Sequence, residues 1–254
     1  MTESSLTGKS LAICHLYPEV LNLYGDRGNI ISMKKRLEWR GISCSVTPVR
    51  IGESADFTKF DIFFIGGGQD FEQEVLLSDL GQGKAADITA AIEDGKTFLC
   101  VCGGFQMLGH SYETADGEIC EFLGAVDLTT VAGKARRIDN FAFKLADDLG
   151  GQTIVGYENH SGRTFLGKGV SPLGTIVRGG GNNSEDGTEG VHYRNVFGTY
   201  SHGPVLPKNP FFCDILLATA LTRKYGTCEL EPLDDSCEMR AHDRVLERLL
   251  KGRI

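Results

Sequence analysis

Two short apolar runs that each stop at glycines constrain the fold of this 254-residue chain more than any other feature. The first is DIFFI at residues 61–65, which is followed by three glycines. The second is TFLCV at 97–101, which is followed by Cys102 and two glycines. Apolar runs of this length are typical of strands buried on both faces of a parallel sheet. The sequence therefore predicts a parallel sheet with a buried centre.

Helical patterns alternate with these runs and with further strand-like segments. Strands are also expected at 10–16, 42–49 and 196–200, and helices at 27–40, about 71–94, about 211–225 and 237–250. Strands that alternate with helices form βαβ units. We therefore expect an α/β fold, a three-layer sandwich around a mostly parallel central sheet. The length suits a single domain over residues 1–254, with short β-prone pieces between residues 122 and 200.

Charge and composition disfavour several classes of function. The formal net charge is −8, whereas binding to a nucleic-acid backbone needs clustered cations. The N-terminus lacks the features of a signal peptide, and no apolar run approaches the roughly 18 residues of a membrane span, so we expect a cytoplasmic protein without membrane insertion. Cys100 and Cys102 have no second ligand pair at zinc spacing, so no metal site is expected.

Cys102 stands where a catalytic nucleophile would stand in such a sheet. Ligand sites of open α/β sheets lie beyond the carboxyl ends of the strands, and Cys102 directly follows the run at 97–101. The order strand, cysteine, two glycines and the helix-like FQMLG is similar to a nucleophile elbow, and a helix N-terminus there would favour the thiolate. A strict elbow has glycine where this chain has Cys100, so a structural buried thiol is the alternative.

A nucleophilic thiol needs a base, and His202 is the best placed of the six histidines. It follows the β-prone run at 196–200 and precedes a Gly-Pro turn, so we expect it at the same edge of the sheet as Cys102. His160 is the rival, since it also follows an apolar strand. The glycines at 66–68 fit neither G-x-G-x-x-G nor a Walker pattern, which disfavours a nucleotide-phosphate site.

Five separated motifs extend this interpretation: LNLYGDRGNI, IGGGQDFEQE, CGGFQMLG, GYENHSGRT and GTYSHGPVLPKN. Over roughly residues 10–250, the chain resembles the class I glutamine amidotransferase domains of the cobyric acid synthase type, whose fold is flavodoxin-like. The resemblance includes small stand-alone subunits that work with the Mur-ligase-like protein MurT in Gram-positive cell-wall synthesis. It implies a glutaminase that passes ammonia to a MurT-like partner, which uses ATP to convert the D-glutamate of lipid II to D-isoglutamine.

The resemblance also implies catalytic roles for single residues. Cys102 corresponds to the nucleophile that forms a glutamyl thioester, and His202 to the general base and acid. Gly67 or Gly68, together with Gly103, is implied to donate backbone N–H groups to the oxyanion.

Substrate, cofactor and partner roles are implied in the same way. Arg136 corresponds to an arginine that binds the glutamine α-carboxylate, with Arg137 as the alternative, and Gln106 is expected to line the pocket or to pack within its helix. No cofactor is expected in this chain, because ATP and Mg²⁺ belong to the partner ligase. The helices from about residue 209 are expected to contribute to the partner interface, and the lipid-linked acceptor places the complex near the inner face of the membrane.

One departure from the family pattern concerns the acid of the catalytic triad. Many class I amidotransferases have glutamate two positions after the histidine, whereas this chain reads His202-Gly203-Pro204. The resemblance implies that an acidic residue of the partner orients His202 instead. The alternative functions are an amidotransferase subunit for a cobyrinate-like acceptor and a stand-alone cysteine hydrolase, which would need an acid of its own.

Overall fold

A six-stranded sheet forms the centre of the molecule, as the two apolar runs predict. The structure is a computed structural model that describes residues 8–68, 76–226 and 229–253. The sheet order is β11 (Val191–Tyr193), β12 (Val196–Thr199), β4 (Thr97–Val101), β3 (Ile62–Ile65), β1 (Ser10–Leu16) and β2 (Ser43–Val49). All neighbours pair in parallel except β11, which is antiparallel to β12. The mostly parallel central sheet is therefore confirmed.

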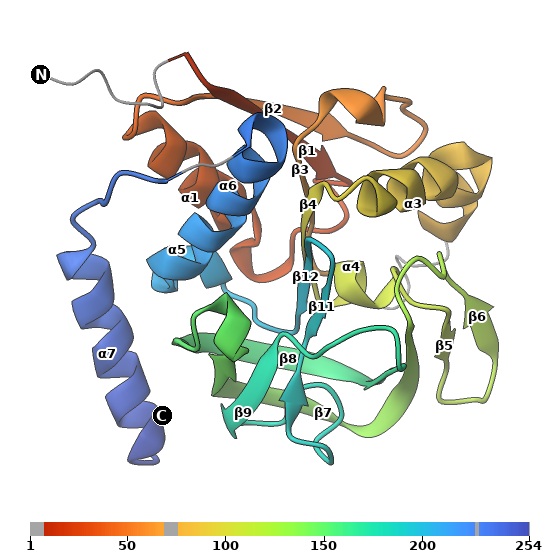
Figure 1. Cartoon of the computed structure of the whole chain (residues 1–254). Helices are drawn as coiled ribbons and strands as arrows, with labels where there is room; N and C mark the ends of the chain where they lie inside the picture. The colour runs from red at the N-terminus through yellow and green to blue at the C-terminus, as the bar shows by residue number, and fades with distance from the viewer. Residues whose placement is uncertain (1–7, 69–75, 227–228, 254) are drawn as a thin grey trace, which may run out of the picture.

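Helices cover both faces of this sheet and complete the three layers (Figure 1). α1 (Arg27–Glu38) and α6 (Pro210–Tyr225) lie on one face, and α3 (Ala85–Glu93) lies on the other. α3 follows a π-helical turn at Leu80–Lys84, so the expected helix at about 71–94 is irregular, and residues 69–75 lie outside the described residues. α1 is followed by Gly41 with φ +70°, a conformation that suits the end of a helix.

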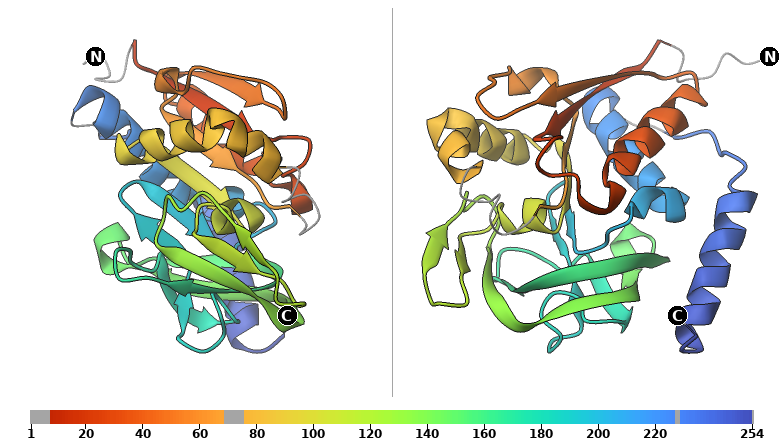
Figure 2. Two further views of the ribbon diagram at one scale, coloured as in Figure 1. Left: turned by 90° about the vertical axis from the view of Figure 1, so that its right-hand side faces the viewer. Right: turned by 180° about the vertical axis from the view of Figure 1, so that it is seen from behind.

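A second sheet packs beside the first and was not predicted as a separate unit (Figure 2). It contains β10 (Thr188–Glu189), β9 (Gly174–Arg178), β7 (Leu128–Leu145), β5 (Ser111–Glu113) and β6 (Ile119–Glu121), with β8 (Thr153–Leu166) paired to β7. Its pairs are antiparallel except that of β5 with β7. The remaining helices of the C-terminal part are α5 (Val205–Lys208) and α7 (Ser236–Leu250).

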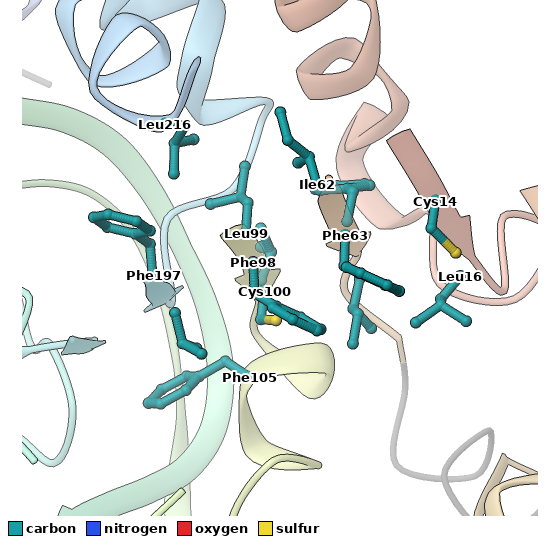
Figure 3. Close-up of a cluster of buried hydrophobic side chains, with 14 of the residues drawn as sticks. Cys14, Leu16, Ile62, Phe63, Phe98, Leu99, Cys100, Phe105, Phe197 and Leu216 are labelled. Carbon is teal, nitrogen blue, oxygen red and sulfur yellow. The ribbon is translucent and has the colours of Figure 1, made fainter. Parts of the chain in front are cut away.

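Aromatic side chains from neighbouring strands fill the core (Figure 3). Phe63 of β3 stacks on Phe98 of β4 with ring centroids 4.5 Å apart, and both side chains are fully buried. Burial of one such ring stabilises a fold by about 1.5–3 kcal/mol. Cys100 also points into this core, and burial raises the pKa of its thiol well above the ordinary value. Cys100 is therefore a structural thiol.

The parallel register brings the ends of several strands to one edge of the sheet. Ile65 pairs with Cys100, and Thr199 pairs with Val101. The segments that follow β3, β4 and β12 therefore meet at this edge, together with the segment that follows β1. These segments carry the glycine loop, Cys102 and the predicted histidine.

Candidate active site

Cys102 forms a sharp turn between β4 and the short helix α4 (Gly103–Gln106). Its backbone has φ 50° and ψ −111°, a conformation that costs roughly 1–3 kcal/mol unless the surroundings impose it. Gly104 lets the turn pack closely, because a Cβ there would lie 2.7 Å from the carbonyl oxygens of Ile65 and Gly66. This geometry is that of a nucleophile elbow, and it favours the nucleophile over the structural-thiol interpretation of Cys102.

His202 lies next to Cys102, as its position after β12 predicts. The imidazole is 0% exposed, and its backbone N–H donates to the carbonyl of Tyr157 over 2.8 Å. Burial by itself would lower the pKa of His202, but the negative charges of Cys102 and Asp26 raise it to about 10. A raised pKa favours the protonated imidazole, which suits the acid that protonates a leaving amine.

In the sequence, Asp26 stands where a cap of the following helix would stand, and among the acids of the described residues it is the one that contacts this histidine. Its side chain makes no capping hydrogen bond to α1. Its Oδ2 lies 3.5 Å from Nδ1 of His202 and accepts the N–H of Gly67 over 2.9 Å. The acid before α1 was the available signal in the sequence, but the same position is typical of helix caps.

Glu158 and Asp70 are the other acids of this chain that the sequence offers for orienting His202; Asp70 lies outside the described residues, and Glu158 contacts different groups. Its carboxylate accepts the N–H groups of Gly180 and Gly181 over 2.8 and 3.1 Å. It also lies 3.6 Å from His160, the rival histidine, whose ring stacks on Tyr200 at 3.6 Å between centroids. His160 is thus held in a buried cluster with an acid and an aromatic ring, which favours a structural role.

The glycine amides expected to bind the oxyanion differ in their surroundings. The N–H of Gly67 is already engaged by Asp26. Gly68 follows it on the same loop, and Gly103 begins α4 directly after Cys102. This arrangement favours Gly68 and Gly103 as the oxyanion donors. Because α4 has only four residues, the N–H groups of its first turn would contribute more than a helix dipole.

Arg136 is connected to His202 through the side chains of Asn159 and Tyr24. Its Nε donates to Oδ1 of Asn159 over 2.6 Å, and the Asn159 amide donates to the Tyr24 hydroxyl. The Tyr24 ring packs edge-on against His202 with centroids 5.0 Å apart. A guanidinium held here can meet a carboxylate with its remaining N–H groups.

Arg137 has a different position from its neighbour. It pairs with His160 in the β7–β8 register, and its side chain runs over Gly180, where a Cβ would lie 2.3 Å from Cδ of the arginine. The contacts of the two arginines therefore favour Arg136 as the one that binds glutamine.

Gln106 points away from solvent at the end of α4. Its side chain is 3% exposed, and its Nε2 donates to the Tyr200 hydroxyl over 2.9 Å. A Cβ on Gly162 would lie 2.4 Å from the same nitrogen. These contacts agree with packing between the sheets, so a role of Gln106 in lining the pocket stays a prediction.

The described residues contain no cluster of three or more His, Cys, Asp or Glu side chains that could hold a metal ion. Within the same ranges, no helix combines the length and apolar character needed to cross a membrane. The site brings together a strained cysteine, a buried histidine, an acid and backbone amides. This set can carry out acyl transfer through a thioester.

Known proteins match this chain over most of its length. The family model for the CobB/CobQ-like glutamine amidotransferase domain matches residues 12–210. Subunit GatD of lipid II isoglutaminyl synthase (glutamine-hydrolyzing) from Staphylococcus aureus is 42% identical over 94% of this chain and 96% of its own length. The subunit of the same name from Streptococcus pneumoniae is 41% identical over 89% of this chain and 88% of its own length.

Two further similarities are more limited. A cobyric acid synthase from Listeria monocytogenes is 32% identical over 67% of this chain, but the match covers only 33% of that protein. A chain from the structure of PurLQS from Thermotoga maritima superposes with a TM-score of 0.55 over 84% of this chain and 96% of its own length. That chain is 16% identical in sequence, so it bears on the fold alone.

Proposed function

Because the chain belongs to the family of CobB/CobQ-like glutamine amidotransferase domains, we propose that it is the glutamine-hydrolysing subunit of a lipid II isoglutaminyl synthase. The observation that carries this proposal is the elbow at Cys102, with φ 50°, packed against the buried imidazole of His202. The identity to two subunits of that name over about nine-tenths of the chain supports the same assignment.

The first half of the reaction makes a thioester and releases ammonia. The Cys102 thiolate attacks the side-chain amide carbon of glutamine, and the amide oxygen becomes an oxyanion that the N–H groups of Gly68 and Gly103 stabilise. The C–N bond then breaks as protonated His202 gives its proton to the leaving nitrogen. Ammonia leaves, and a γ-glutamyl thioester remains on Cys102.

The second half hydrolyses this thioester. Neutral His202 takes a proton from a water molecule, whose oxygen attacks the thioester carbonyl through the same oxyanion site. The C–S bond breaks, and glutamate leaves from the thiol. Arg136 holds the α-carboxylate of the substrate throughout, in an orientation that Asn159 supports by accepting from Nε.

The ammonia passes to a MurT-like ligase subunit that uses ATP and Mg²⁺ to amidate the D-glutamate carboxyl of lipid II. Such an acceptor is attached to a lipid, which places the complex on the cytoplasmic side of the membrane. The helices from about residue 209, α6 and α7, contribute to the contact with this partner. A cobyrinate-like acceptor has weaker support, since the similarity to a cobyric acid synthase covers only a third of that protein.

The test combines the purified chain with a MurT-like partner, ATP, Mg²⁺, glutamine and lipid II. Mass spectrometry should find amidated lipid II, and glutamate should form in equal amount. Cys102→Ala should abolish both products, whereas Cys44→Ala, which alters a half-buried thiol on the edge strand β2, should change neither. Failure of the wild-type pair to form glutamate, or amidation only of a cobyrinate-like acceptor, would contradict the proposal.

A further inference from the structure

A cavity of about 580 Å³ opens between α1 and the C-terminal parts of β1 and β2. This volume lies within the range of small-molecule sites. Ligand sites of open α/β sheets lie at the carboxyl ends of the strands, and the catalytic centre uses the ends of β3, β4 and β12. Of the described residues, those that line the cavity do not include Cys102 or His202. The cavity is therefore separate from the catalytic centre.

Cations predominate in the lining of this cavity. The basic side chains are Arg27, Lys34, Lys35 and Arg50. Among the described lining residues, Glu19 is the one acid. Glu38 pairs with both lysines and Glu53 with Arg50, so acids outside the lining compensate part of the charge. The side chain of Arg27 has no ion-pair partner within the described ranges. Because the whole chain has a formal net charge of −8, this local group of cations indicates an anionic ligand.

His15 adds to the lining a polar group that lacks a partner. The residue is 6% exposed, and its Nε2 has no hydrogen-bond partner among the described residues. The ring packs against Phe64 with centroids 5.3 Å apart. Burial and then the charge of Arg27 lower the pKa of His15 to about 4, against the opposing charges of Glu19 and Asp26. The imidazole is therefore neutral at pH 7. Buried polar groups are normally paired, and a neutral imidazole can donate an N–H to an anion.

We propose that this cavity binds a small molecule that carries a diphosphate group. The site is additional to the catalytic centre and does not depend on the function proposed above. Arg27, Lys34 and Arg50 neutralise the phosphate oxygens, since several cations together exceed the single charge of a carboxylate. His15 donates from Nε2 to one of these oxygens and thereby gains the missing partner.

Apolar side chains in the same lining suit the rest of such a ligand. They are Ile30, Ile31, Val46 and Pro48. A nucleobase or an isoprenyl chain can pack on such side chains, and each occurs attached to a diphosphate, as in ADP and in farnesyl diphosphate. The two ligands share the anionic group and differ in the part that contacts the apolar residues.

The test measures binding of inorganic diphosphate, ADP and farnesyl diphosphate to the full chain by isothermal titration calorimetry at pH 7. Wild type should bind inorganic diphosphate with a Kd of about 100 µM or lower. Arg27→Gln combined with Lys34→Gln should weaken binding about tenfold or more, because two cations of the site are removed. Tighter binding of ADP than of inorganic diphosphate would assign the apolar residues to a nucleobase. Tighter binding of farnesyl diphosphate would assign them to an isoprenyl chain.

Lys59→Gln combined with Lys144→Gln is the matched control. Both lysines are exposed and pair with a nearby aspartate, as Lys34 pairs with Glu38. Neither is among the described residues that line the cavity. This variant loses the same charge as the test variant and should bind diphosphate like wild type.

His15→Phe separates the hydrogen bond from general attraction between charges. Phenylalanine retains a ring beside Phe64 and leaves the net charge at pH 7 unchanged, because His15 is neutral there. Binding should weaken about tenfold through loss of the hydrogen bond. NMR titration of the His15 ring in wild type needs no variant. It should show a pKa above about 4 when diphosphate is bound, since a nearby anion favours the imidazolium.

Three results would overturn the proposal. The first is no binding of any of the three probes at about 5 mM. The second is equal weakening in the variant of Lys59 and Lys144, which would show general attraction to the surface. The third is equally tight binding of glutamate, which would show that the site does not select a diphosphate.

Discussion

Gly67→Ala provides a steric test of how closely the glycine loop approaches the catalytic histidine. A Cβ at residue 67 would lie 2.5 Å from Cε1 of His202 and 3.2 Å from Oδ2 of Asp26. Ordinary contact begins near 3.4 Å, so the imidazole must move by about 0.9 Å. A misplacement of about 1 Å can cost about 100-fold in rate, which corresponds to about 2.7 kcal/mol in activation free energy.

The same variant separates the effect of moving the His202 ring from the effect of losing the hydrogen bond between Gly67 and Asp26. Alanine retains the backbone N–H that Asp26 accepts, so a loss of rate cannot come from a missing donor. Moving the ring should cost about 1–3 kcal/mol in the free energy of unfolding, as for other overpacked sites. We therefore expect a folded protein with kcat for glutamine hydrolysis about 100-fold lower.

The assay follows glutamate formation at saturating glutamine, together with urea denaturation of the same samples. Gly81→Ala is the matched control, because a Cβ there meets nothing within 4 Å and the residue lies in a helical turn. It should leave kcat unchanged and raise stability slightly. A folded Gly67→Ala protein with kcat within twofold of wild type would refute the close approach of residue 67 to His202.

Three further predictions follow from the site and the core. Cys102→Ala should reduce glutamine hydrolysis to background with a thermal midpoint within a few degrees of wild type, whereas loss of folding would support the structural-thiol interpretation. Arg136→Ala should raise KM about tenfold with little change in kcat, since the carboxylate contact is made in ground and transition states alike; the same effect in Arg137→Ala alone would assign the role to that residue. Burial raises the pKa of Glu189 to about 7 from an ordinary 4.5, despite hydrogen bonds that oppose the shift, so the folded state favours the protonated acid. The free energy of unfolding should therefore decrease as the pH rises from about 4.5 to about 7, by up to about 3 kcal/mol. Urea denaturation at pH 5 and pH 8 should show that Glu189→Gln abolishes this dependence. An unchanged dependence in the variant would show that Glu189 does not cause it.

The central sheet could be predicted because its signals are local. A buried parallel strand needs a short apolar run, and the chain shows this in β3 and β4 directly. The helix ends also had local signals, such as Gly41 after α1. The elbow at Cys102 was predictable for the same reason, since the strand, the nucleophile and two glycines are adjacent in sequence.

The second sheet had no comparable signal. β7 runs over 18 residues with a long exposed stretch in its middle, and its register with β8 shifts between Ala132 and Arg137. A strand of this kind shows neither a continuous apolar run nor a regular alternation. Its pairing with β8 and β9 depends on contacts between distant parts of the chain, which a pattern within one segment does not reveal.

The sequence by itself determined the parallel sheet and indicated Cys102 and His202 as candidates, because each follows a strand and the carboxyl ends of parallel strands meet at one edge. It did not determine what the buried carboxylate of Asp26 contacts. Asp26 precedes a helix, where the same residue type serves as a cap, and nothing near it in sequence indicates His202. Among the described residues, the packing of Gly28 on Pro204 and the hydrogen bond from Leu206 to Asn29 bring the two segments together. The identity of a residue is local, whereas the partner of a buried charge is decided by the tertiary structure around it.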